Sequence, residues 1–173
     1  MSISGNKTLT HLHTAAQTTP DKPAFYMPGG VSLSWAQLQA TAYAVAASVC
    51  AHISAEAREQ DLPVVILADR SPGSAAAILG AMAAGVWYVP IDPELPAERI
   101  SHYLAVCQPA LILTRSDLDA HFDFSRYPVI DTDTVPPAPD FVPVERTARA
   151  GVRNFHLWFD RNAQARGEKP LRD

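Results

Sequence analysis

Acidic and histidine residues that could hold a metal ion gather in two places in this sequence. The first is an alternating run made up of Asp117, Asp119, His121 and Asp123. This alternation is typical of a solvated loop or helix end, which we favour over a metal site. The second is the pair Asp131 and Asp133, directly after an expected strand, where α/β folds often bind ligands. No base or phosphate-binding loop accompanies the pair, so we interpret both as turn residues.

The other reactive side chains form no catalytic pattern. His11 and His13 are two positions apart, so a helix would point them in different directions, which disfavours a shared metal site. Cys50 and Cys107 lack metal-ligand spacing, and we interpret both as buried thiols in a reducing compartment. The sequence contains no G-x-S-x-G, no H-E-x-x-H and no G-x-G-x-x-G motif.

Length and composition indicate one globular domain. The chain has 173 residues, of which 47% are hydrophobic and 18% charged, enough apolar content for a single core. Its net charge of −4 gives no electrostatic reason to expect nucleic acid or an anionic membrane as partner. No apolar signal sequence opens the chain, and the longest apolar run, Ser74 to Val89, is too short to span a bilayer. We therefore expect a cytoplasmic protein.

The first part of the chain predicts two helices and a hairpin. One short helix is expected over residues 9–18, ended by Thr19-Pro20. Two β-prone runs around Pro28-Gly29-Gly30 predict a hairpin. Ser34 and Gln37 then form a capping-box pattern that opens a second helix.

The central part predicts an α/β fold. Apolar runs at 63–68, 86–91 and 111–114 predict buried strands, and a fourth short strand is expected at 128–130. Ser71-Pro72 begins and Gly85 ends an alanine-rich helix between the first two strands, and Pro96 begins a helix before the third. Alternating strands and helices predict a partial parallel sheet with flanking helices. Pro136-Pro137-Ala138-Pro139 predicts a linker.

Three stretches resemble the N-terminal subdomain of adenylate-forming enzymes, the AMP-dependent synthetase/ligase family. LSWAQL at 33–38 is similar to the family's L-[TS]-Y-x-E-L segment, and DRSP at 69–72 to the D-R-S-x after the first central strand. AMAAGVWYVPID at 81–92 is similar to the block L-K-A-G-x-A-Y-V-P-L-D, with Ala83 in place of lysine and Trp87 in place of a small residue. Its Tyr-Val-Pro-Ile-Asp ending favours the adenylation domains of nonribosomal peptide synthetases. The resemblance covers residues 9–143.

The resemblance implies functions for the intact family and structural roles for the residues present. An intact relative would activate an amino acid with ATP and Mg²⁺ and load it on the thiol of a carrier protein, beside neighbouring synthetase domains. We interpret Gly85 as a helix cap, Pro90 as a strand terminator, and Arg70 and Asp92 as partners in local hydrogen bonds. No catalytic, cofactor-binding or metal-binding residue is assigned.

Adenylate formation brings two anions together, so it requires backbone N–H groups, hydroxyls, a lysine and Mg²⁺ to hold negative charge. The family supplies the backbone N–H groups with a loop T-S-G-S-T-G-x-P-K-G after the linker. No such loop is present in the sequence. We therefore expect a truncated adenylation domain that is inactive alone. Two alternatives are a non-catalytic partner or regulator of a synthetase in trans and an unrelated α/β binding module.

Residues 144–173 form an irregular tail in place of this loop. A terminal helix with surface aromatics is one interpretation of the tail. The other is out-of-frame translation. When the frame is shifted forward by one base, codons for Ala150 to Ala165 can spell LAYVIFTSGSTGTPK, the phrase expected here. The codons of Trp158 and Phe159 force the first glycine of the loop, and Ala165-Arg166 cannot supply the glycine that should follow the lysine. We infer a base gained or lost near residues 143–150.

Overall fold

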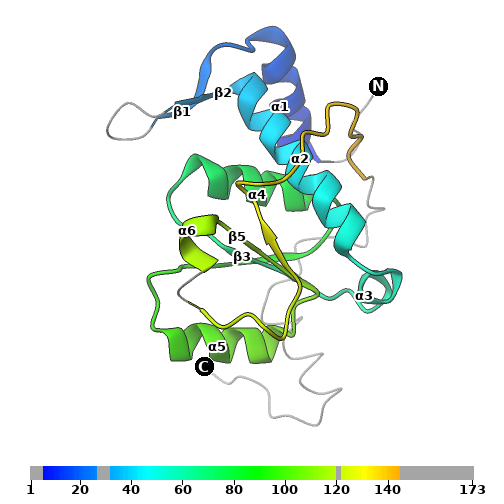
Figure 1. Cartoon of the computed structure of the whole chain (residues 1–173). Helices are drawn as coiled ribbons and strands as arrows, with labels where there is room; N and C mark the ends of the chain where they lie inside the picture. The colour runs from blue at the N-terminus through cyan, green and yellow to red at the C-terminus, as the bar shows by residue number, and fades with distance from the viewer. Residues whose placement is uncertain (1–5, 27–31, 120–121, 145–173) are drawn as a thin grey trace.

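The computed structural model describes residues 6–26, 32–119 and 122–144 (Figure 1). Its centre is a parallel sheet whose strands lie in the order β4-β3-β5-β6. In chain order the four strands are β3 (Val64–Leu67), β4 (Tyr88–Ile91), β5 (Leu111–Thr114) and β6 (Val129–Asp131). The predicted fold class, a parallel sheet with flanking helices, is confirmed.

The two central strands come from the most apolar runs of the sequence. Every residue of β3 and β5 is buried, because helices cover both faces of the sheet at these positions. Alternate side chains therefore enter two different cores, Ile66 on one face and Leu67 on the other. This explains why both runs are continuously apolar instead of alternating.

The strand predicted at 86–91 is present as β4, but it is not buried throughout as predicted. β4 is an edge strand in which Ile91 is buried, Tyr88 and Val89 are half-buried and Pro90 is exposed. The carbonyl groups of Trp87 and Ile91 accept hydrogen bonds from Val64 N of β3 and from Ala68 N just after it, over 2.8 and 2.9 Å. The backbone of Pro90 therefore faces the free edge. A proline lacks the N–H that a further strand would need, and such positions suit it.

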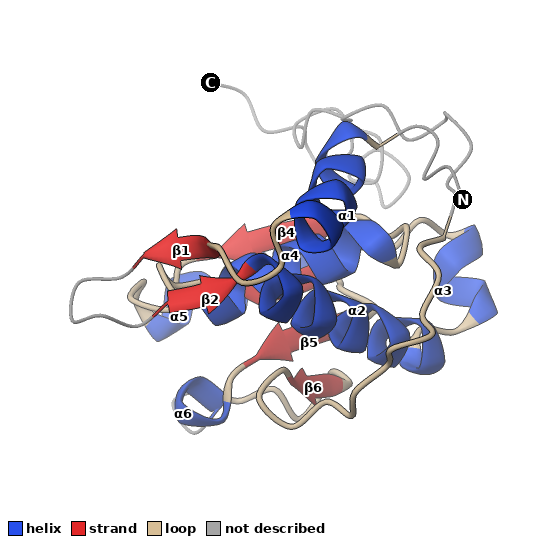
Figure 2. Cartoon of the chain, turned by 90° about the horizontal axis from the view of Figure 1, so that it is seen from above, coloured by secondary structure: helices blue, strands red, loops and turns tan. Residues whose placement is uncertain are grey.

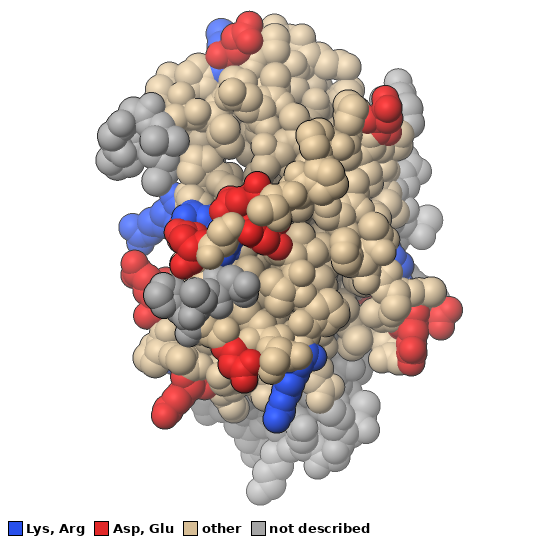
Figure 3. All heavy atoms as spheres, in the orientation of Figure 1, with Lys and Arg blue, Asp and Glu red and all other residues tan. Residues whose placement is uncertain are grey.

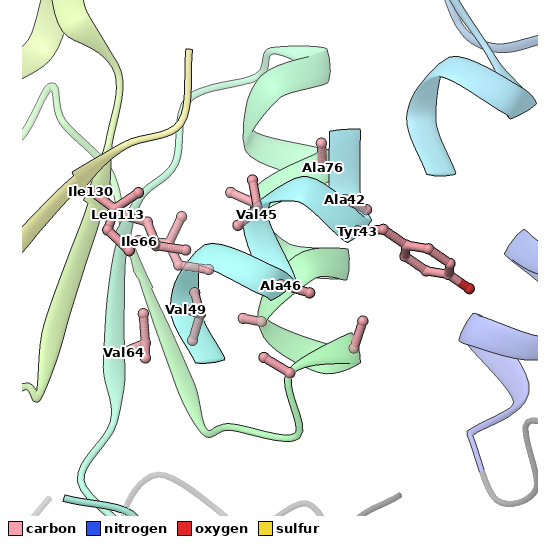
Figure 4. Close-up of a cluster of buried hydrophobic side chains, with 14 of the residues drawn as sticks. Ala42, Tyr43, Val45, Ala46, Val49, Val64, Ile66, Ala76, Leu113 and Ile130 are labelled. Atoms are coloured by element: carbon pink, nitrogen blue, oxygen red, sulfur yellow. The ribbon is translucent and has the colours of Figure 1, made fainter. Parts of the chain in front are cut away.

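Two helices cover one face of the sheet. They are α2 (Trp35–His52) and α4 (Pro72–Ala83), and they pack directly against each other (Figures 1 and 4). The predicted capping box begins α2: Gln37 N donates to Ser34 Oγ over 3.3 Å, and Ser34 N donates to Gln37 Oε1 over 2.9 Å. In Figure 4, Val45 and Val49 of α2 point toward the sheet, whereas Tyr43 points away from it.

The prediction that Gly85 ends α4 is confirmed. Gly85 has φ +66°, in the left-handed region that glycine adopts without strain. Its N–H donates to Met82 O over 3.1 Å, and the next N–H, of Val86, donates to Ala81 O over 3.2 Å. This pair of bonds is a Schellman motif, which satisfies carbonyls left open at the end of the helix.

The opposite face is covered by α5 (Ala97–Cys107) together with the aromatic loop before β6. Ile100, Leu104 and Cys107 of this helix are buried against the sheet. Pro96 precedes the helix as predicted, and Glu98 lies in its first turn. The helix ends at Gln108, which has φ +44°.

The first part of the chain packs against α2, and Leu9 and Leu12 join the same hydrophobic core. It contains α1 (Lys7–Thr18) and an antiparallel hairpin of β1 (Pro23–Tyr26) and β2 (Ser32–Ser34) (Figure 2). The predicted helix and hairpin are confirmed, except that the tip, residues 27–31, lies outside the described residues. Two short helices were not predicted, α3 (Ala55–Glu59) and α6 (Ser116–Asp119), because four or five residues carry too little periodicity.

The chain after β6 returns to the helices. Residues 135–139 form no helix or strand, as the proline-rich linker predicts. Phe141 then packs its ring against Tyr43 of α2, with centroids 5.8 Å apart, and Val144 N donates to Ala83 O at the end of α4 over 2.8 Å. The segment that follows the linker is therefore fastened to the helical layer.

Candidate functional site

The carboxyl ends of the four parallel strands lie at one edge of the sheet, and most of the chemistry-bearing side chains gather there. The order β4-β3-β5-β6 means that the chain leaves β3 toward one side of the sheet and later returns to place β5 on the other side. Ligands in open α/β sheets bind outside such a switch point. A ligand site in this fold is therefore expected at the carboxyl ends of β3 and β5.

Asp69 follows β3 and occupies this position with both carboxylate oxygens engaged. Its Oδ1 accepts from Ser71 N over 3.0 Å and from Ser74 Oγ over 2.6 Å. Its Oδ2 accepts from Arg115 Nη1, also over 2.6 Å. Ser74 is buried and Ser71 caps α4, so Asp69 is tied to the first turn of that helix.

Arg115 directly follows β5 and joins two loops. Besides Asp69, it binds Asp117 through two parallel bonds, Nε to Oδ1 over 3.2 Å and Nη2 to Oδ2 over 2.6 Å. Its side chain is 23% exposed, whereas that of Asp117 is 60% exposed. Arg115 therefore links the end of β3 to the loop that follows β5, directly across the switch point.

The charges of this cluster hold each other in the ionised form. Burial favours the neutral carboxyl of Asp69, but hydrogen bonds from Ser71 and Ser74 and the charge of Arg115 outweigh it, so the pKa of Asp69 is lowered. Burial likewise opposes the charge on Arg115, but the carboxylates of Asp117, Asp69 and Asp133 outweigh it and raise the pKa of Arg115.

Asp131 and Asp133 extend the same cluster at the end of β6. Asp133 N donates to Asp131 Oδ1 over 2.9 Å, the turn contact that the sequence predicts. Ser116 adds contacts that were not predicted: its hydroxyl donates to Asp131 Oδ2, and its N–H donates to Asp133 Oδ2 over 3.4 Å. The loops after β5 and β6 are therefore bound together by these carboxylates.

The remaining candidates do not join this site. His11 stacks edge-on against Trp35, with ring centroids 5.5 Å apart, whereas Nδ1 of His13 lies 3.1 Å from Nε2 of Gln39. The two histidines have different partners, so they do not share a site. Cys50 is half-buried against the core under α2, and Cys107 is buried on the opposite face of the sheet.

The residues of the alternating acidic run do not form a common site either. Asp117 binds Arg115, and Asp123 accepts a bond from Ser125 N over 3.0 Å in its own turn. The side chain of Asp119 and all of His121 lie outside the described part of the chain. Within that part, no group of three or more His, Cys, Asp and Glu side chains could hold a metal ion.

Asp92 and Arg70 were both predicted to make local hydrogen bonds. Asp92 Oδ1 accepts from Glu94 N over 2.9 Å, which confirms its predicted local role. Arg70 is exposed. Residues 145–173 lie outside the described residues, so the domain boundary at 143 stays a prediction.

The charged side chains of this cluster are mostly acidic. The cluster combines four carboxylates with one guanidinium, namely Asp69, Asp117, Asp131, Asp133 and Arg115. Figure 3 shows the acidic and basic atoms side by side at the level of α6. Since Arg115 already binds two carboxylates, this cluster of side chains carries net negative charge.

Sequence reasoning identified Asp69 within a family block but missed Arg115, its partner. Two signals were available. Each residue follows a continuously apolar strand closely, and the carboxyl ends of neighbouring parallel strands meet at one edge. The strand order decides which strands are neighbours, and this order is not visible in the sequence.

The chain was compared with known proteins. A family model described as AMP-binding enzyme matches residues 12–164. Tyrocidine synthase 3 of Brevibacillus parabrevis is 38% identical over 116 residues, which is 66% of this chain and 2% of that protein. D-Alanine–D-alanyl carrier protein ligase of Listeria welshimeri is 28% identical over 120 residues, 69% of this chain and 23% of the ligase.

A solved structure shares the fold. A four-domain nonribosomal peptide synthetase bound to AMP and glycine superimposes with a TM-score of 0.66 and 26% identity, over 77% of this chain and 10% of that one. The chain thus spans a small part of each of these relatives. None of the helices in the described part of the chain is long and apolar enough to cross a membrane.

Proposed function

Because the chain belongs to the family of AMP-binding enzymes, we propose that it is the opening segment of an amino-acid-activating adenylation domain. The observation that carries this proposal is the block at 81–92, which builds the end of α4, the Gly85 cap and strand β4. Its similarity to peptide synthetases is supported by the match to tyrocidine synthase 3. In an intact protein of this type, ATP and Mg²⁺ would serve adenylate formation, and a carrier-protein thiol would receive the amino acid.

We further propose that the 173-residue polypeptide does not form an adenylate unaided. Joining a carboxylate to the α-phosphate of ATP requires donors that neutralise several negative charges. The sequence contains no loop with the glycines and hydroxyls for this task. The carboxyl edge offers carboxylates in its place, with Arg115 already bound to Asp69 and Asp117.

Amino-acid-dependent exchange of pyrophosphate into ATP tests this proposal. The purified chain should show no exchange with any of the twenty amino acids, while an excised adenylation domain of a peptide synthetase serves as the positive control. Circular dichroism of the same sample should show folded protein, so that a negative result reports on chemistry and not on unfolding. Exchange above background with one amino acid would refute the proposed inactivity, and the adenylation-domain assignment would then stand on stronger ground.

The tail from residue 144 onward is proposed to be translated out of frame. The support is the phrase LAYVIFTSGSTGTPK, which the codons of Ala150 to Ala165 can spell after a shift of one base. The gene sequence decides the matter directly. We expect the bases under these residues to encode the loop in the shifted frame, and a reading that encodes another phrase excludes the idea.

The family match favours this interpretation over an unrelated α/β binding module. A role in trans, as a partner or regulator of a synthetase, stays an alternative. A pull-down with a neighbouring synthetase would support this role in trans. The outcome of the pull-down does not depend on the result of the exchange assay.

A further inference from the structure

We draw no further inference here: the strongest candidate, the Asp69–Arg115–Asp117 cluster at the carboxyl ends of β3 and β5, belongs to the site already described, and no second observation among the described residues points to a ligand for it.

Discussion

Asp69 shows how a single side chain can hold two loops in place. It accepts bonds from the first turn of α4 through one oxygen and from Arg115 through the other. These contacts replace the water that would solvate the carboxylate, and its side chain is only 31% exposed. The charge of Asp69 therefore contributes more to holding the loops at this edge than the charge of a fully exposed carboxylate would.

We expect Asp69→Asn to lower the free energy of unfolding at pH 7 by about 1–2 kcal/mol, the range for hydrogen bonds to charged groups reduced for partial exposure. Because the pKa of Asp69 is lowered in the folded protein, its contribution is fully present above the unfolded pKa, about 3.9. The contribution is lost as the pH falls through the folded pKa. Urea unfolding of both proteins at pH 7 and at a lower pH where both stay folded measures the difference.

The matched control is Asp140→Asn, on an exposed turn, which should change the stability by less than about 0.5 kcal/mol at either pH. If Asp69→Asn does not destabilise the protein at pH 7, the ionised carboxylate makes no net contribution to stability. The Asp69–Arg115 ion pair would then make no electrostatic contribution to the free energy of unfolding.

At the scale of elements, the contact between α2 and α4 depends on the absence of a side chain at Gly80. A Cβ at this position would lie 2.8 Å from Ala42 O and 2.8 Å from Val45 Cβ. Both neighbours are fixed: one atom is backbone, and Val45 is completely buried. The helices can approach this closely only because glycine and alanine line the contact.

Gly80→Ala should therefore cost about 1–3 kcal/mol of stability, the usual range for overpacking, despite the better helix propensity of alanine. The control is Gly73→Ala in the same helix, where the nearest atoms, Arg115 Cδ and Ser71 Oγ, are 3.6 Å away. This second substitution should be neutral or stabilise by up to about 1 kcal/mol. Equal unfolding midpoints of the two variants in urea would mean that the helices separate without cost.

At the scale of the whole molecule, both sheet faces are covered, and no further strand pairs with β4 or β6 among the described residues. Among the described residues, the large hydrophobic side chains that are exposed are those of Tyr26, Val142 and Val144. The β4 edge lacks the N–H of Pro90, and at the β6 edge the carbonyl of Asp131 accepts from Thr134 N over 3.2 Å.

We expect Pro90→Val to increase self-association, because it restores an N–H on the free edge of β4 and adds a residue with high β-propensity. Sedimentation velocity over a range of concentrations measures the effect. Pro137→Val, in the exposed linker, adds the same side chain away from the sheet and should leave the sedimentation unchanged. Unchanged sedimentation of both variants would show that this edge is protected by something other than its proline.

The sequence by itself determined the elements whose signals are local. The capping box of Ser34 and Gln37, the glycine end of α4 and the apolar runs of β3 and β5 all depend on residues within a few positions of each other. Chain geometry over such short distances leaves few choices, so the pattern predicts the structure. The three stretches that resemble adenylate-forming enzymes are also local in sequence, and they identified the fold.

Only the tertiary structure decided which elements are neighbours. Arg115 lies 46 positions from Asp69, and Phe141 packs on Tyr43 across an even longer stretch of chain. The place of β4 at the edge of the sheet is decided in the same way. Such contacts depend on how all the helices and strands pack at once, since burying apolar surface on both sheet faces selects one strand order. The charged cluster at the carboxyl ends of β3 and β5 follows from that selection.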